Sequence, residues 1–162
     1  MAIELPIDIN KVKGFLDPLE GEALYSYAKK YTKEGDALEI GSYCGKSAVY
    51  IGSAVKENNQ KLYSIDHHKG SEEQQPGEEF FDPDLLNKEG NGINTLPYFL
   101  NTINSSKLKK IVIPVISSSE DDTAAGPTTA TWFRGLSCNR RKRSGYRDSN
   151  PHKPPKWTFI RL

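Results

Sequence analysis

A strand, a glycine-bearing turn and a helix start follow one another in residues 37–47, and this order constrains the fold more than any other part of the chain. Residues 37–41 read Ala-Leu-Glu-Ile-Gly, and Gly45 precedes the Lys46-Ser47 pair at which a helix is predicted to begin. In parallel α/β sheets the strand brings the chain to the sheet edge, glycine lets the backbone approach a ligand, and the helix start offers unpaired N–H groups. The segment therefore predicts a nucleotide pocket at the edge of a parallel sheet.

A second acid, Asp66, ends the next strand-like run, which covers residues 61–66. Glu39 and Asp66 are thus expected at the tips of neighbouring strands. Two carboxylates at these tips accept hydrogen bonds from hydroxyl and amine groups, whereas they repel bare phosphates. This pair favours an adenosine-type ligand.

Helical and strand-like segments alternate through the first 120 residues. Asp17 and Glu20 have the capping-box arrangement around Pro18, which predicts a helix that ends near Gly35. Further segments follow in the order strand 37–41, helix 45–57, strand 61–66, helix 96–103 and strand 110–116. The alternation predicts an α/β fold, a partial doubly wound, Rossmann-like parallel sheet with three recognisable strands and helices on its faces.

The chain changes character near residue 120. Residues 1–122 contain 13 Lys and Arg against 20 Asp and Glu, whereas residues 123–162 contain 9 basic residues and 1 acid. After residue 120 there is no amphipathic helical pattern and one short strand candidate, residues 157–160. We therefore predict a domain part in residues 1–120 and a basic, disordered C-terminal tail in residues 121–162.

Composition excludes several classes of function and location. The two cysteines, Cys44 and Cys138, make no disulfide or zinc framework, and the sequence shows neither a signal peptide nor a run of about 20 apolar residues. These observations predict a cytoplasmic protein without a membrane partner. Residues 140–143 are basic but lack spaced aromatic residues for base stacking, so nucleic acid is not the favoured partner.

A long polar stretch, residues 67–94, follows the second predicted strand and contains five glutamates and two aspartates. Connections of this length are functional lids or disordered segments. At its start, Asp66, His67 and His68 suggest a metal site. Adjacent side chains on an extended segment point in opposite directions, so the three do not readily share one ion, and no metal is assigned.

The glycine turn matches neither common phosphate motif. A P-loop needs four residues between its first glycine and Gly-Lys-Ser, but three stand here between Gly41 and Gly45. The Rossmann dinucleotide pattern also fails, because Tyr43 and Lys46 replace its second and third glycines. Two alternatives stay open at this point: a P-loop-like nucleotide hydrolase that uses Gly45, Lys46 and Ser47, and a nucleic-acid-binding module that uses the basic tail.

Several separated segments together resemble class I S-adenosylmethionine-dependent methyltransferases, in a bacterial subgroup that acts on small molecules. They are residues 39–47, 64–73, 75–77, 82–83 and 94–99, within a resemblance over about residues 10–119. The resemblance implies S-adenosylmethionine as cofactor and a small-molecule methyl acceptor, and it leaves a homo-oligomer open. It implies these cofactor-binding residues: Glu39, Gly41, Ser42, Tyr43, Gly45, Lys46, Ser47, Asp66 and His67.

The same resemblance implies particular roles. Glu39 would face the methionine amine or fix the turn, Gly41 and Gly45 would let the backbone pass the cofactor, and Asp66 would take the ribose hydroxyls. No catalytic base is implied; His67, His68 and the loop acids are candidates by position only. The family's sheet has seven strands, whereas the pattern here stops after three. Our hypothesis is a truncated or frameshifted methyltransferase whose first strand exposes an unpaired edge and whose stability is marginal.

Overall fold

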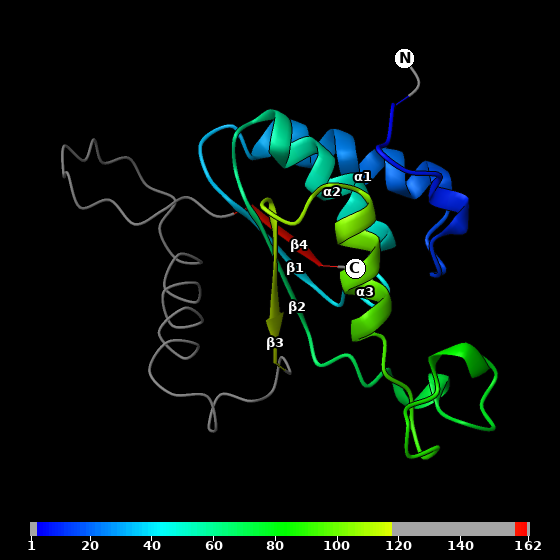
Figure 1. Cartoon of the computed structure of the whole chain (residues 1–162). Coiled ribbons are helices and arrows are strands. Elements are labelled where there is room, and N and C mark those ends of the chain that lie inside the picture. Colours follow the sequence, from blue (N-terminus) through cyan, green and yellow to red (C-terminus); the bar gives the residue numbers. More distant parts are fainter. Residues whose placement is uncertain (1–2, 118–157, 162) are drawn as a thin grey trace, which may run out of the picture.

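The computed structural model describes residues 3–117 and 158–161 (Figure 1). Its four strands form one parallel sheet in the order β3-β2-β1-β4. The strands are β1 (Ala37–Ile40), β2 (Leu62–Asp66), β3 (Val112–Ile116) and β4 (Thr158–Arg161), and the helices are α1 (Pro18–Tyr31), α2 (Lys46–Glu57) and α3 (Leu96–Ser105). This arrangement confirms the predicted partial Rossmann-like α/β fold.

Helix α1 begins at the predicted position because its first turn is capped in both directions. The Asp17 carboxylate accepts a hydrogen bond from the Leu19 backbone N–H at 2.8 Å, and the Glu20 carboxylate accepts one from the Asp17 N–H at 3.3 Å. Pro18 occupies the first helical position, where its missing N–H costs nothing. The capping box predicted from the sequence is confirmed.

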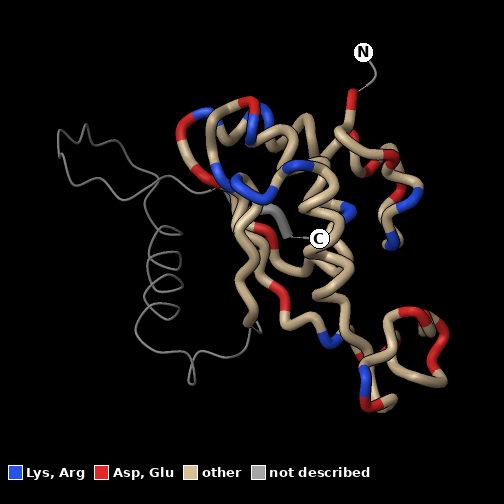
Figure 2. Tube along the Cα trace, in the orientation of Figure 1, with Lys and Arg blue, Asp and Glu red and all other residues tan. Residues whose placement is uncertain are grey.

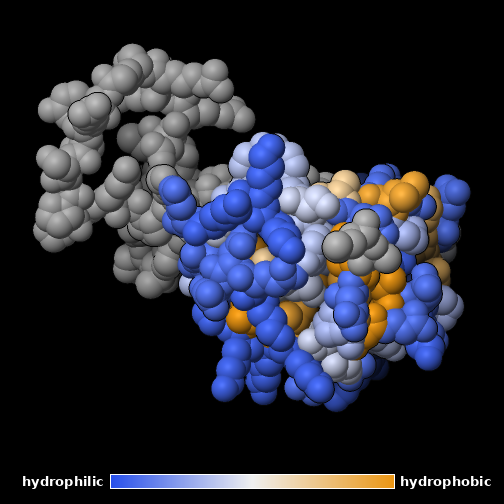
Figure 3. Space-filling model, turned by 90° about the horizontal axis from the view of Figure 1, so that it is seen from above, coloured by the Kyte–Doolittle hydropathy of each residue, from blue (hydrophilic) through white to orange (hydrophobic). Residues whose placement is uncertain are grey.

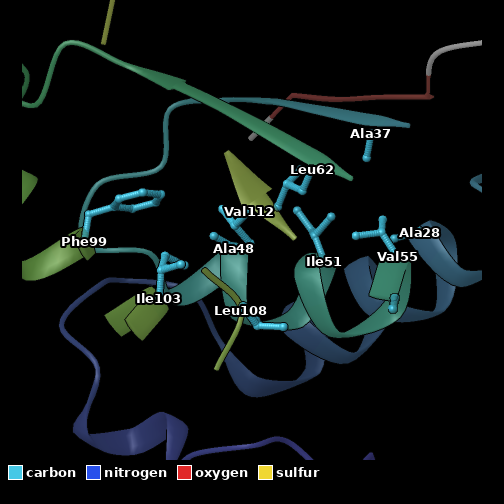
Figure 4. Packing of buried hydrophobic residues seen from close by; sticks show 11 residues of the cluster. Ala28, Ala37, Ala48, Ile51, Val55, Leu62, Phe99, Ile103, Leu108 and Val112 are labelled. Carbon is cyan, nitrogen blue, oxygen red and sulfur yellow. The ribbon is translucent and has the colours of Figure 1, made fainter. Parts of the chain in front are cut away.

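The hydrophobic core lies between the sheet and the three helices, which all cover one face of it (Figure 4). Ala37, Leu62 and Val112 stand side by side on β1, β2 and β3 and point toward the helices. Ile51 from α2 and Phe99 from α3 pack against them and are completely buried. This layer fixes the carboxyl ends of β1 and β2 at one edge of the sheet.

Strand β1 has a neighbour on each side. It pairs with β2 on one side and in parallel with β4 on the other, from Ala37 opposite Thr158 to Ile40 opposite Arg161. The expectation that β1 exposes an unpaired edge is therefore wrong. The bounds of β4 are shifted by one residue from those of the strand candidate at residues 157–160. The remainder of the predicted tail lies outside the described residues.

The long connection between β2 and α3 is folded. It contains the short 3₁₀ helices η2 (Glu72–Gln74) and η3 (Pro83–Leu85), and a third, η1 (Ile9–Lys11), precedes α1. Leu85 and Ile93 of this connection bury themselves against Cys44 and form a second small core. Asp and Glu residues gather along this connection (Figure 2). We call the connection, residues 67–95, the acidic loop.

The surface seen from above carries hydrophobic patches between hydrophilic side chains (Figure 3). Large apolar side chains that stay exposed near α1 include Phe15, Leu19, Tyr27 and Tyr31. In the described part of the chain, no helix combines the length and the apolar character that crossing a bilayer requires.

Close packing between α1 and α2 leads to a first prediction. Gly21 faces the buried Tyr50 ring, and a Cβ at this position would lie 2.3 Å from a ring carbon. Replacing a glycine inside a helix by alanine normally raises the free energy of unfolding by about 1 kcal/mol. Here we expect Gly21→Ala to lower the free energy of unfolding by about 1–2 kcal/mol, because the Tyr50 ring must move.

Urea denaturation measures this change, with Ser26→Ala on the exposed side of α1 as the control. The control should be neutral or slightly stabilising, since alanine also has the higher helix propensity there. If Gly21→Ala is as stable as the control, the Tyr50 ring moves aside at little cost and the prediction is wrong.

Candidate functional site

The turn between β1 and α2 runs through three left-handed residues. The φ angles are +85° at Gly41, +47° at Tyr43 and +89° at Gly45. A Cβ at Gly45 would lie 3.1 Å from the Phe99 ring, whereas a Cβ at Gly41 would meet no atom within 4 Å. Gly45 is thus required by packing as well as by its φ angle, while Gly41 borders open space that a ligand can occupy.

Asp66, at the end of β2, holds this turn by accepting hydrogen bonds from the backbone. Its Oδ2 accepts from the N–H groups of Ser42 and Tyr43, both at 2.8 Å, and its Oδ1 accepts from the His68 N–H at 2.7 Å. A carboxylate offers about four lone-pair positions. Three of them are used within the chain, which leaves about one for a ligand.

Glu39 is completely buried behind the turn. Its Oε1 accepts a hydrogen bond from the Ser47 hydroxyl at 2.6 Å, and its Oε2 accepts one from the Ser64 hydroxyl at 2.7 Å. Burial raises the pKa of this carboxyl from 4.5 to about 7, against the lowering effect of the two hydroxyl donors. Glu39 therefore ties β1 to β2 and to the first turn of α2.

An open cavity of about 630 Å³ lies in front of the turn, within the size range of small-molecule sites. We call it the turn cavity. One wall is formed by residues 13–16, which we call the strap. Helix α1 and Gln74 form a further part of the wall. The turn side of the lining consists of Gly41, Ser42, Tyr43, Lys46 and Ser47. Ser42 belongs to this lining, and its buried hydroxyl has no hydrogen-bond partner among the described residues.

The strap is tied to the acidic loop by two ion pairs. The Lys13 Nζ contacts the carboxylates of Asp82 at 2.6 Å and Asp84 at 2.8 Å. These bonds raise the pKa of Lys13 and lower that of Asp82. The Phe15 ring packs at 5.7 Å from Tyr43 and 5.5 Å from Phe80, measured between ring centroids. The sequence analysis missed this strap.

The predicted site residues fall into three groups. Five line the turn cavity: Gly41, Ser42, Tyr43, Lys46 and Ser47. Glu39, Gly45 and Asp66 support the turn from behind through the contacts described above. His67 lies apart from both groups: it is exposed, its ring Nδ1 accepts from the Lys69 N–H, and it lines a separate cavity of about 580 Å³ formed by the acidic loop.

Neither His68 nor Cys44 is placed as an exposed nucleophile or base. His68 is buried, its Nδ1 shares a hydrogen bond with the Thr95 hydroxyl at 2.8 Å, and burial lowers its pKa. Burial also raises the pKa of the Cys44 thiol to about 12, which keeps it protonated. The described residues hold no group of three or more side chains suited to a metal ion.

The turn is poorly suited to a nucleoside phosphate. The Ser42 and Tyr43 N–H groups, which a P-loop would aim at phosphate oxygens, both point at Asp66. The Gly45 N–H is also used, since it donates to the Ser42 carbonyl at 2.7 Å. A carboxylate directly behind the turn would moreover repel a polyanion. These contacts disfavour the P-loop-like alternative.

Comparisons with known proteins give one family match and a similar solved structure. A family model described as a methyltransferase domain matches residues 38–137, a range that extends beyond residue 120. The chain is also similar to the crystal structure of a putative caffeoyl-CoA O-methyltransferase from Staphylococcus aureus, at 13% sequence identity and a TM-score of 0.43. This likeness covers 70% of the present chain and 41% of that one, so the chain spans less than half of its length.

Proposed function

The chain belongs to the methyltransferase domain family, and from this we propose that it binds S-adenosylmethionine in the turn cavity and transfers a methyl group to a small molecule. The match confirms the family resemblance found in the sequence. The observation that carries the proposal is the turn cavity itself, which has the open backbone of Gly41 in its lining.

The residues present fit such a cofactor. A ligand that lies against Gly41 meets backbone without a side chain in the way. Leu16 and Leu24 supply apolar wall, and the lining also contains Ser42, whose buried hydroxyl has no partner among the described residues. Asp66 lies outside the lining of the turn cavity, so its contribution to cofactor binding is to hold the turn through the Ser42 and Tyr43 N–H groups. We assign Glu39 to fixing the turn, because its two carboxylate oxygens already accept from Ser47 and Ser64.

Bound S-adenosylmethionine supplies an electrophilic methyl group on a sulfonium. The chain's own contribution is to place the acceptor in line with that group and to exclude water. The strap, which Lys13 joins to the acidic loop, forms one wall of the cavity. We assign no general base, because His68 is buried against Thr95 and His67 lines the separate loop cavity.

Calorimetric titration with S-adenosylmethionine tests the proposal, and Gly41→Asn provides the decisive variant. Asparagine tolerates a positive φ better than other side chains, so the fold should persist, but its side chain would enter the space beside the turn. We expect saturable binding by the native chain and a dissociation constant at least about tenfold higher in Gly41→Asn, which corresponds to about 1.4 kcal/mol.

Gly77→Asn is the matched control. Gly77 also has a positive φ, +97°, and open space at its Cβ, but it lies in the acidic loop outside the lining of the turn cavity. The control should bind like the native chain. Absence of binding by the native chain would refute the proposal. Magnesium-dependent binding of a nucleoside triphosphate instead would support the hydrolase alternative.

A further inference from the structure

Helix α1 carries a row of apolar and aromatic side chains on its outer side. The opposite side of the helix, around Gly21 and Ala28, is buried against the rest of the fold. Residues four apart on a helix form a continuous ridge. We call this row the α1 ridge, and its members are Leu19, Ala23, Tyr27 and Tyr31. The exposed fractions of its three large side chains are 76% for Leu19, 57% for Tyr27 and 47% for Tyr31.

The α1 ridge differs from the scattered apolar residues of an ordinary surface. Single exposed apolar side chains are normal, whereas a contiguous row of them marks a surface that another molecule covers. The rings of Tyr27 and Tyr31 lie together on the ridge, with their centroids 4.5 Å apart. Aromatic side chains are enriched in contacts between proteins. The ridge therefore has the composition of an interface.

Charged residues beside the ridge are arranged so that the helix complements itself. Glu20 lies near the first end of α1 and Lys30 near its last. The Glu20 Oε2 accepts the Asp17 N–H, and its Oε1 has no partner among the described residues. The Lys30 Nζ lies over the Tyr31 ring, 5.0 Å from its centroid, and pairs with no carboxylate of the described residues. Each end of the helix thus offers a charge that the opposite end of a second copy can neutralise.

We propose that the α1 ridge is the contact surface between two copies of this chain, whose α1 helices pack antiparallel about a two-fold axis midway along the ridge. In this register Leu19 of one copy lies opposite Tyr31 of the other, and Ala23 lies opposite Tyr27. The small side chain of Ala23 gives room to the Tyr27 ring of the other copy. A two-fold axis makes every contact occur twice.

The same register accounts for the charges. It brings Glu20 of one copy near Lys30 of the other, again twice in each dimer. Ala23 and Glu20 also belong to the lining of the turn cavity, so the second copy lies beside that cavity. The inference does not rest on the proposed function, because neither the ridge nor its charges depend on a bound cofactor.

Sedimentation equilibrium over a concentration series tests the proposal on the full chain and four variants. Tyr27→Glu places a charge at the centre of the ridge, and Lys30→Glu turns the attraction to Glu20 into repulsion. Leu100→Glu is the matched apolar control, because Leu100 is exposed on α3 to a similar extent, 46%. Lys109→Glu is the matched charge control, because Lys109 is exposed before β3. Circular dichroism and thermal unfolding confirm that each variant is folded.

We expect the mass of the native chain to rise with concentration from 18.1 kDa to twice that value. Tyr27→Glu should raise the dissociation constant of the dimer at least about tenfold, because it buries a charge without a partner. Lys30→Glu should raise it at least about threefold, since the repulsion occurs twice. Each control should stay within about twofold of the native chain.

A native chain that keeps a mass of 18.1 kDa at every concentration would overturn the inference, and so would a mass beyond that of a dimer. Native-like dimers of folded Tyr27→Glu, or equal weakening by Tyr27→Glu and Leu100→Glu, would also overturn it, because the contact would then lie off the ridge. The calorimetric titration with S-adenosylmethionine decides the proposed function separately, so either proposal can fail alone.

Discussion

Asp66→Ala is expected to lower the free energy of unfolding by about 3 kcal/mol, although Asp66 is only half-buried. The carboxylate accepts hydrogen bonds from three backbone N–H groups, those of Ser42, Tyr43 and His68. Each such bond contributes about 1 kcal/mol net, and alanine leaves all three donors without their acceptor. Urea denaturation followed by circular dichroism measures the loss.

Asp36→Ala is the control for this prediction. Asp36 is also a half-buried aspartate next to the sheet, but its carboxylate accepts a single backbone hydrogen bond, from the Lys61 N–H at 2.8 Å. Its removal should therefore cost about 1 kcal/mol. Equal losses in the two variants would mean that water readily replaces Asp66 at the turn. The proposed function adds that Asp66→Ala abolishes S-adenosylmethionine binding while Asp36→Ala retains it.

The sequence located the acids of the site but not what they contact. Local periodicity and capping signals place Glu39 and Asp66 at the ends of neighbouring strands, because helices and strands depend largely on nearby residues. The partners of these acids lie on other elements: Ser64 is 25 residues from Glu39, and Ser42 is 24 residues from Asp66. Such pairings depend on the register of β1 and β2, which no local pattern encodes.

The strap is the part of the candidate site that sequence reasoning overlooked. Lys13 and Asp82 are 69 residues apart, and each is one of many charged residues in an ordinary-looking segment. Phe15 likewise finds Tyr43 and Phe80 only after the acidic loop has folded. Lys13 and Phe15 can be seen in the sequence as a cation and an aromatic residue before the cap of α1. Only tertiary packing brings them to the turn.

Strand β4 shows the same limit at the level of topology. Its short β-rich run could be seen at residues 157–160, but its place beside β1 could not, because parallel strands are joined by long crossovers. The hydrogen bonds that β1 makes to β4 remove the open edge that was expected there. Nothing within residues 37–40 distinguishes a central strand from an edge strand except their strongly apolar character.

The stability of this protein is expected to fall by about 3 kcal/mol as pH rises from 4.5 to above 7, through the titration of Glu39. Burial raises the Glu39 pKa to about 7 in the folded chain, against 4.5 for the unfolded one. The folded state therefore holds a proton that the unfolded state has lost, so this contribution is complete below pH 4.5 and lost as pH passes 7. Urea denaturation at intervals from pH 4.5 to pH 8.5 measures it.

Glu39→Gln isolates this contribution, because its amide can still pair with the Ser47 and Ser64 hydroxyls but does not titrate. His68 acts with the opposite sign, since its lowered pKa makes stability rise with pH up to about 6.5, but His68 is present in both proteins and cancels. The difference in unfolding free energy between native chain and variant should therefore change by about 3 kcal/mol, in favour of the variant at high pH. A constant difference would show that Glu39 is ionised in the fold, with Ser47 and Ser64 stabilising its charge fully.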